Sequence, residues 1–154
     1  MSKLLSVLFV AMLALATPAL AEKELVLPID ITIEMWNSDP NDKTRKMVFS
    51  EDLVTITEGA TITWVATDRG HNVEFVHGPE GAELPGKSKL GADFEFTFTV
   101  PGVYVYVCTP HSSMGMLGVV IVGEATAEQI AAALEVKNIR GASKKKLEAL
   151  LAGL

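Results

Sequence analysis

Cysteine and histidine are both scarce in this sequence. Its 154 residues include one cysteine, Cys108, and three histidines. A single cysteine cannot form a disulfide within the chain, which excludes the disulfide framework of many small exported proteins. The thiol of Cys108 must therefore be buried and inert, pair with another chain, act as a nucleophile or bind a metal.

The sequence also lacks an apolar run long enough to span a bilayer, which takes about 20 residues. Its longest run, residues 4–16, follows Lys3 and precedes an Ala-Leu-Ala site at residues 19–21. This pattern is typical of a secretory signal peptide, so we expect residues 1–21 to be cleaved after export. The remaining 133 residues are enough for one domain and too few for two ordinary ones.

Positive charge is low, and no phosphate-binding motif is present. Without the signal peptide the chain has 12 Lys and Arg against 19 Asp and Glu, a net charge of −7. This balance disfavours nucleic acid as a partner. The sequence contains no glycine-rich phosphate loop, internal repeat or low-complexity tract.

Short segments of alternating apolar and polar residues dominate the first 122 positions. Such alternation predicts half-buried strands, because successive side chains of a strand point to opposite faces. The candidate segments are residues 29–34, 54–57, 61–64, 73–76, 94–99, 103–108 and 117–122. With turn residues between them, they predict an all-β sandwich or barrel of about eight short strands.

The pattern changes to that of helices after Gly123. Thr126 and Gln129 match a capping box at the start of an alanine-rich helix that runs to about Val136. Ser143 is expected to cap a second helix, whose leucines are Leu147, Leu150, Leu151 and Leu154. Two helices this short are marginal alone, so we expect residues 124–154 to form a hairpin packed on residues 22–123 as part of the same domain.

The segment CTPHSSMGM, residues 108–116, concentrates potential metal ligands in one loop between the last two strands. Cys108 and His111 offer a thiolate and an imidazole, and His71 in TDRGHNV can add a second imidazole. Either Met114 or Met116 can supply a thioether. Two His, one Cys and a distant Met form the ligand set of blue-copper electron-transfer sites.

These residues also have other interpretations. A lone Cys in a β-sandwich is often a small buried hydrophobic residue, and a lone His is often a surface residue, as we expect for His77. A structural zinc site needs a fourth Cys, His or carboxylate ligand, which a thioether replaces poorly. A Cys-His hydrolase needs an oriented base and an oxyanion site, and no motif marks either one.

The segments TDRGHNVEFV, PGVYVYVCTPHSSMGMLGVVIVG and Lys87-Ser88-Lys89, with the helical tail, resemble the pseudoazurins, periplasmic blue-copper proteins of the cupredoxin family. The resemblance covers nearly all of the chain after the signal peptide. It implies an eight-stranded cupredoxin Greek-key sandwich with two short C-terminal α-helices. It also implies one type 1 copper ion with the ligands His71, Cys108, His111 and Met116, because pseudoazurins place the methionine five residues after the histidine.

The resemblance further implies a soluble electron carrier of the periplasm and not an enzyme. We expect a monomer, because nothing in the sequence demands a larger assembly. Asn72 matches the asparagine that ties the His71 segment to the Cys108 loop. Expected partners are redox proteins with acidic surfaces, such as copper nitrite reductase or another denitrification reductase, and a cytochrome c-type donor. Neither nucleic acid nor, after signal cleavage, a membrane is expected as a partner.

Docking is expected around His111, on an apolar patch of Pro110, Met47, Met114 and Leu117. The basic residues that could surround this patch are Lys43, Arg45, Lys46, Arg69, Lys87 and Lys89. The main alternative function is a periplasmic copper carrier or storage protein, although such proteins favour exposed Met-rich or His-rich ligands. A multicopper enzyme is excluded because three histidines are too few.

Overall fold

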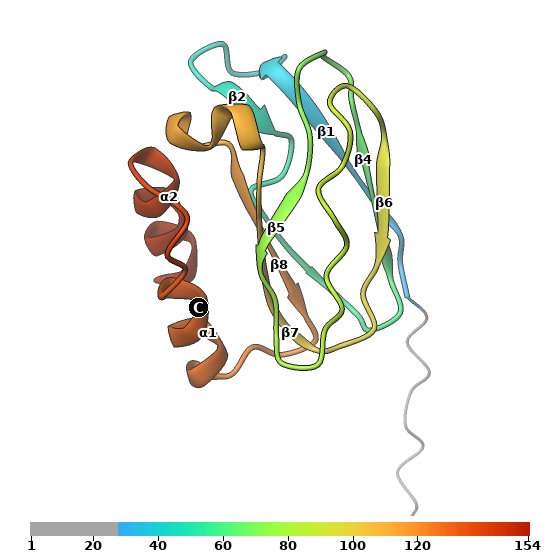
Figure 1. Cartoon of the computed structure of the whole chain (residues 1–154), viewed down its shortest axis with the longest axis vertical. Coiled ribbons are helices and arrows are strands. Elements are labelled where there is room, and N and C mark those ends of the chain that lie inside the picture. The colour runs from blue at the N-terminus through green and yellow to red at the C-terminus, as the bar shows by residue number, and fades with distance from the viewer. Residues whose placement is uncertain (1–27) are drawn as a thin grey trace, which may run out of the picture.

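A computed structural model describes residues 28–154, so the expected signal peptide lies outside the described residues. Two four-stranded sheets form a sandwich, as Figure 1 shows. In spatial order, the strands of the first sheet are β2 (Lys46–Phe49), β1 (Ile31–Ser38), β4 (Thr61–Val65) and β6 (Phe94–Thr97). Those of the second sheet are β3 (Leu53–Ile56), β8 (Leu117–Val122), β7 (Gly102–Val107) and β5 (Glu74–His77). The pairs β1–β4 and β3–β8 are parallel and the others antiparallel. The predicted eight-stranded sandwich is confirmed.

Strands β7 and β8 are buried along their whole length. On one face, Tyr104, Tyr106 and Cys108 enter the core between the two sheets. On the other face, Val103 and Val105 pack beneath the C-terminal helices. Both faces of these strands are therefore covered, and the alternation directs the side chain of Cys108 into the sandwich.

Trp64 lies at the centre of the core between the sheets. Its ring makes edge contacts with Phe75 and Tyr106, at centroid separations of 5.8 and 5.1 Å. The ring of Phe49 meets that of Tyr106 edge to face, at a centroid separation of 4.8 Å. Large aromatic rings that meet edge to face contribute packing beyond the area they bury, so this cluster gives the sandwich a rigid interior.

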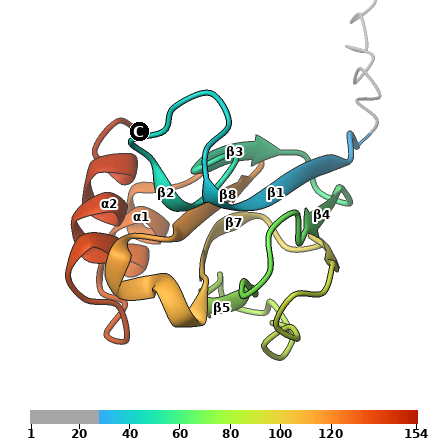
Figure 2. The ribbon, with the colours of Figure 1, turned by 90° about the horizontal axis from the view of Figure 1, so that it is seen from above.

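Two helices, α1 (Ala127–Leu134) and α2 (Ala142–Leu151), cover the outer face of the second sheet (Figures 1 and 2). The capping box is confirmed, because the side chains of Thr126 and Gln129 each bond to the other's backbone N–H group. Neither helix is long and apolar enough to cross a membrane.

The predicted cap of α2 is wrong. Gly141 occupies the N-cap position, and Ser143 lies inside the first turn, fully buried. The hydroxyl group of Ser143 bonds instead to a carbonyl group of a distant loop, described below. The leucine stripe is confirmed for Leu147 and Leu151, which are buried, whereas Leu154 is 57% exposed.

The sequence pattern did not predict β2, and it placed the start of β1 too early. Met47 has a φ of +50° within β2, and the next two residues, Val48 and Phe49, are both buried. This strand therefore lacks the alternation by which strands are recognised. Ile29 precedes β1 and is 74% exposed, so the regular pattern continues there beyond the sheet.

Candidate metal centre

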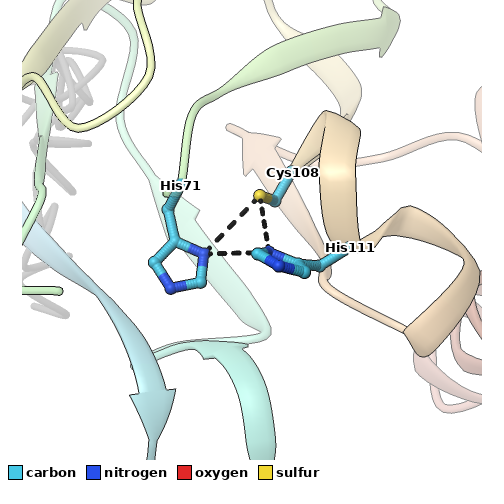
Figure 3. Close-up of side chains that lie close together, drawn as sticks. All are labelled: His71, Cys108 and His111. Carbon is cyan, nitrogen blue, oxygen red and sulfur yellow. Dashed lines mark hydrogen bonds between the residues drawn. The ribbon is translucent and has the colours of Figure 1, made fainter. Parts of the chain in front are cut away.

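Three potential metal ligands converge at one end of the sandwich (Figure 3). The sulfur of Cys108 lies 3.6 Å from Nδ1 of His71 and 3.4 Å from Nδ1 of His111. The two Nδ1 atoms are 3.2 Å apart. Segments 37 residues apart in the sequence thus direct three donor atoms to a single point.

Cys108 and His111 are held by a tight loop. The 3₁₀ helix η1 (Thr109–Met114) begins directly after Cys108, and Pro110 lies in its first turn. The N–H group of His111 donates to the carbonyl group of Cys108 at 3.1 Å, and that of Met116 donates to the carbonyl group of His111 at 3.2 Å. The N–H group of Cys108 donates to the carbonyl group of Met116 at 3.0 Å, which closes the loop.

His71 is oriented by a residue that the sequence pattern did not indicate. Its Nε2 atom lies 3.0 Å from Oδ1 of Asn37. Because Oδ1 can only accept a hydrogen bond, Nε2 carries the proton and Nδ1 presents its lone pair to the cluster. Asn37 is fixed in turn, because its backbone N–H group donates to Oδ2 of Asp68 at 2.7 Å.

Asn37 gave no signal in the sequence, because it is one polar residue near the end of a strand, 34 positions from His71. The glycine before His71, Gly70, is often a sign that the backbone closely approaches another group. Its φ is +90°, and a side-chain carbon at this position would meet no atom within 4 Å, which indicates a different reason for glycine. The chain needs a left-handed residue there to turn His71 inward.

Asn72 joins the two segments that supply the donors. Its Oδ1 atom accepts a hydrogen bond from the backbone N–H group of Thr109 at 2.9 Å. Its Nδ2 group donates to Oγ1 of Thr109 at 3.1 Å. Asn72 itself is only 2% exposed, whereas its partner Thr109 is exposed, so both bonds are partly buried. This is the link that the resemblance implied, between the His71 segment and the loop after Cys108.

The site has little contact with solvent. His71 and Cys108 are fully buried, and His111 is half-buried. Burial lowers the pKa of His71, and the nearby His111 lowers it further. Burial raises the pKa of the Cys108 thiol, while the backbone N–H groups of Asn72 and His111 oppose that rise. Both effects favour the neutral imidazole of His71, and a cation bound beside Cys108 would displace the thiol proton.

The geometry fits a small metal ion. A point equidistant from the three donor atoms lies about 2.0 Å from each, close to metal–imidazole and metal–thiolate bonds of about 2.0–2.3 Å. One thiolate with two imidazoles is also the trigonal donor set of type 1 copper. The residues present therefore fit the ion that the donor set predicts.

The two candidate methionines differ in burial. Met116 is fully buried and belongs to the same core cluster as Cys108, whereas Met114 is 54% exposed. His77 lies in β5, and it is half-buried where the sequence predicted a surface residue. Burial lowers its pKa.

Two parts of the expected docking region are corrected. Leu117 is fully buried beneath the C-terminal helices, so it cannot belong to an exposed apolar patch. Arg45 forms ion pairs with Asp39 at 2.6 Å and Asp52 at 3.1 Å. Its positive charge is thus neutralised by carboxylate groups of the same chain. The other basic residues of the expected patch, Lys43, Lys46, Arg69, Lys87 and Lys89, are exposed.

Residues 38–123, more than half of the chain, match the family of copper binding proteins described as the plastocyanin/azurin family. The pseudoazurin of Methylorubrum extorquens is 35% identical, over 94% of this chain and 97% of its own. The pseudoazurin of Paracoccus pantotrophus is 39% identical, over 75% of this chain and 73% of its own.

Solved structures give the same result. The crystal structure of pseudoazurin from Methylobacterium extorquens superposes with a TM-score of 0.71 at 34% identity, over 81% of this chain and 98% of that one. The crystal structure of pseudoazurin from Hyphomicrobium denitrificans superposes with a TM-score of 0.70 at 32% identity, over 82% of this chain and 98% of that one. The chain therefore belongs to the plastocyanin/azurin family of copper binding proteins and, within it, to the pseudoazurins, which carry electrons through one type 1 copper ion and are not enzymes.

Proposed function

We propose that His71, Cys108, His111 and Met116 bind the copper ion of this chain, and that the protein carries electrons between redox proteins of the periplasm. The observation that supports the first three ligands is the triangle of two Nδ1 atoms and one Sγ atom, with sides of 3.2–3.6 Å. The burial of Met116 in the same core cluster as Cys108 supports it as the fourth ligand. When bound, the ion supplies one-electron chemistry, because thiolate and thioether favour Cu(I) while imidazole tolerates Cu(II).

The protein keeps the donor atoms in one arrangement in both oxidation states. Asn37 fixes the ring of His71, and Asn72 ties the segment of His71 to that of Cys108. Water is excluded from His71 and Cys108, which are fully buried. Little therefore has to move when an electron arrives or leaves, and rapid exchange of the metal, as in a storage protein, is disfavoured.

We propose that electrons pass through the imidazole of His111, the half-buried member of the donor set. For its docking patch we propose the apolar side chains of Pro110 and Met114, which are exposed, and of Met47, which is half-buried. A His111→Gly variant, loaded with copper and given external imidazole, should exchange electrons with its partner more slowly than wild type. Equal rates would refute this route.

The exposed side chains of Lys43, Lys46, Lys87, Lys89 and Arg69 support docking of an acidic partner. A chain with net negative charge can still steer such a partner through locally clustered cations. The proposed acceptors are copper nitrite reductase or another denitrification reductase, with a cytochrome c-type donor. The association rate should fall as added salt shortens the Debye length below about 10 Å. A rate that rises with salt would contradict this docking mode.

The first experiment is the addition of one equivalent of Cu(II) to the purified protein lacking residues 1–21. Intense visible absorption from a copper–thiolate bond, with narrow EPR hyperfine splitting, is expected for wild type and should be absent in Cys108→Ser. Met116→Leu should alter the spectrum and reduction potential, while the matched change Met114→Leu should alter neither. A colourless wild-type product would refute the proposed site and would favour a copper carrier without a thiolate ligand.

Export can be tested separately. We propose that residues 1–21 are a cleaved signal peptide, and that residues 22–123 and 124–154 form one monomeric domain. Mass spectrometry of the protein from a periplasmic extract should give a chain that begins at Glu22. Recovery of the full-length chain from the cytoplasm would contradict this proposal.

A further inference from the structure

Helix α2 contacts the loop that carries the potential ligands, and both Figure 1 and Figure 2 show η1 next to this helix. The hydroxyl group of Ser143 donates to the carbonyl group of Ser112 at 2.5 Å. The ammonium group of Lys146 donates to the carbonyl group of Gly115 at 3.3 Å. Both acceptors lie between His111 and Met116.

The two carbonyl groups already take part in closing the loop. The Ser112 carbonyl accepts a hydrogen bond from the N–H group of Gly115 at 3.1 Å, and the Gly115 carbonyl accepts one from that of Leu117 at 2.9 Å. Each oxygen thus receives one bond from within the loop and one from α2. Since a carbonyl oxygen has two lone pairs, the helix completes the bonding of both groups.

The surroundings of Lys146 differ from those of an ordinary helix lysine. Its side chain is only 20% exposed, whereas its neighbours Lys144 and Lys145 are exposed. A buried charge is unfavourable unless it is paired and hydrogen-bonded. Oδ1 of Asp52 lies 2.6 Å from the ammonium group, which fulfils this condition. The helix therefore directs one charged group inward, between an acidic partner and the loop carbonyl.

The first turn of α2 fits closely against the end of η1. Serine near a helix start normally caps that helix, but here the N-cap is Gly141, and the hydroxyl group of the fully buried Ser143 turns to the loop. Ala142 packs against Gly115, where an added side-chain carbon would come within 3.3 Å of Ala142. The residues of this turn thus contact the loop through both a hydrogen bond and close packing.

We propose that α2 braces the ligand loop, with Ser143 and Lys146 as positioning residues that fix the Ser112 and Gly115 carbonyl groups and thereby the relative placement of His111 and Met116. This inference rests on the proposed function, because it takes His111 and Met116 as copper ligands. The brace acts in the metal-free protein, so the loop is preorganised before the ion binds.

The first test measures amide hydrogen exchange in the metal-free protein. Ser143→Ala and Lys146→Met should each speed exchange at Gly115 and Met116 by about fivefold, relative to amides of β7 and β8, as expected for the loss of one hydrogen bond. Lys145→Met makes the same change of charge without a loop contact and should leave these rates unchanged. Because Ser143→Ala removes a single oxygen atom, it keeps the test available if Lys146→Met does not fold.

The second test separates positioning from stability in the copper-loaded protein. Ser143→Ala and Lys146→Met should shift the reduction potential and the visible spectrum, and Lys146→Arg should restore both. Leu151→Ala, at the other end of α2, should lower the melting temperature without moving either readout.

If Ser143→Ala and Lys146→Met changed only stability, as Leu151→Ala is expected to do, the brace would be refuted while the proposed function stood. A colourless wild type would refute the proposed ligands instead. The exchange rates of the metal-free protein would then still show whether α2 holds the loop.

Discussion

Replacing Asn72 with alanine removes the hydrogen bonds that join the His71 segment to the loop after Cys108. These two bonds, to the backbone N–H group and the hydroxyl group of Thr109, measure 2.9 and 3.1 Å. The substitution also removes a weaker bond of 3.5 Å to the carbonyl group of Ser88, which lies between β5 and β6. Each good hydrogen bond contributes about 1 kcal/mol net, and a partly buried backbone N–H group left unpaired adds to the loss. The expected fall in the free energy of unfolding is therefore about 2–3 kcal/mol.

For a domain of this size, each kcal/mol corresponds to roughly 4 °C in melting temperature, so Asn72→Ala should lower Tm by about 8–12 °C. The assay is thermal unfolding of the metal-free protein followed by circular dichroism, with urea unfolding as a second measure. Asn41→Ala is the matched control, because Asn41 is exposed and its side chain makes no hydrogen bond among the described residues. A Tm change for Asn72→Ala no larger than that of the control would refute the assigned role of these bonds.

Three further predictions test other parts of the molecule. Asn37→Ala should weaken Cu(II) binding about tenfold in a competition titration, because the ring of His71 loses the partner that fixes its tautomer. Gly118→Ala should lower the unfolding free energy by about 1–3 kcal/mol in urea, because a side-chain carbon there would lie 2.3 Å from the ring of Tyr106. Burial lowers the pKa of His77 from its ordinary value of 6.5, so the unfolded chain takes up a proton more readily than the folded protein. The contribution of neutral His77 to stability is therefore fully present above pH 6.5 and is lost as the pH falls below that value. His77→Gln should therefore lose less stability than wild type between about pH 7 and pH 5.

Matched variants control these predictions. Asn41→Ala should leave the copper affinity unchanged, and Gly86→Ala should be nearly neutral, because a side-chain carbon at Gly86 has no neighbour within 4 Å. An Asn37→Ala affinity equal to that of wild type would mean that water replaces the amide. An acid transition of His77→Gln that superposes on the wild-type curve would assign the pH dependence to other groups, such as His71, whose pKa burial also lowers.

The sequence by itself determined the parts of this protein that depend on neighbouring residues. The capping box of Thr126 and Gln129 is formed by side chains three positions apart, and the structure confirms it. Cys108 and His111 are equally close in sequence, so one tight loop necessarily brings them together. Alternating segments likewise predicted most strands, because the period of side chains along a strand is a local property.

Only the tertiary structure decided which distant groups meet. Asn37 contacts His71 from 34 positions away in the sequence, Ser143 contacts Ser112 from the second helix, and no periodicity encodes either contact. Leu117 was expected at the surface because nothing in its own segment shows that a helix covers it. Hydrogen bonds and burial between remote segments depend on how the layers pack, whereas the sequence pattern shows only which residues are able to take part.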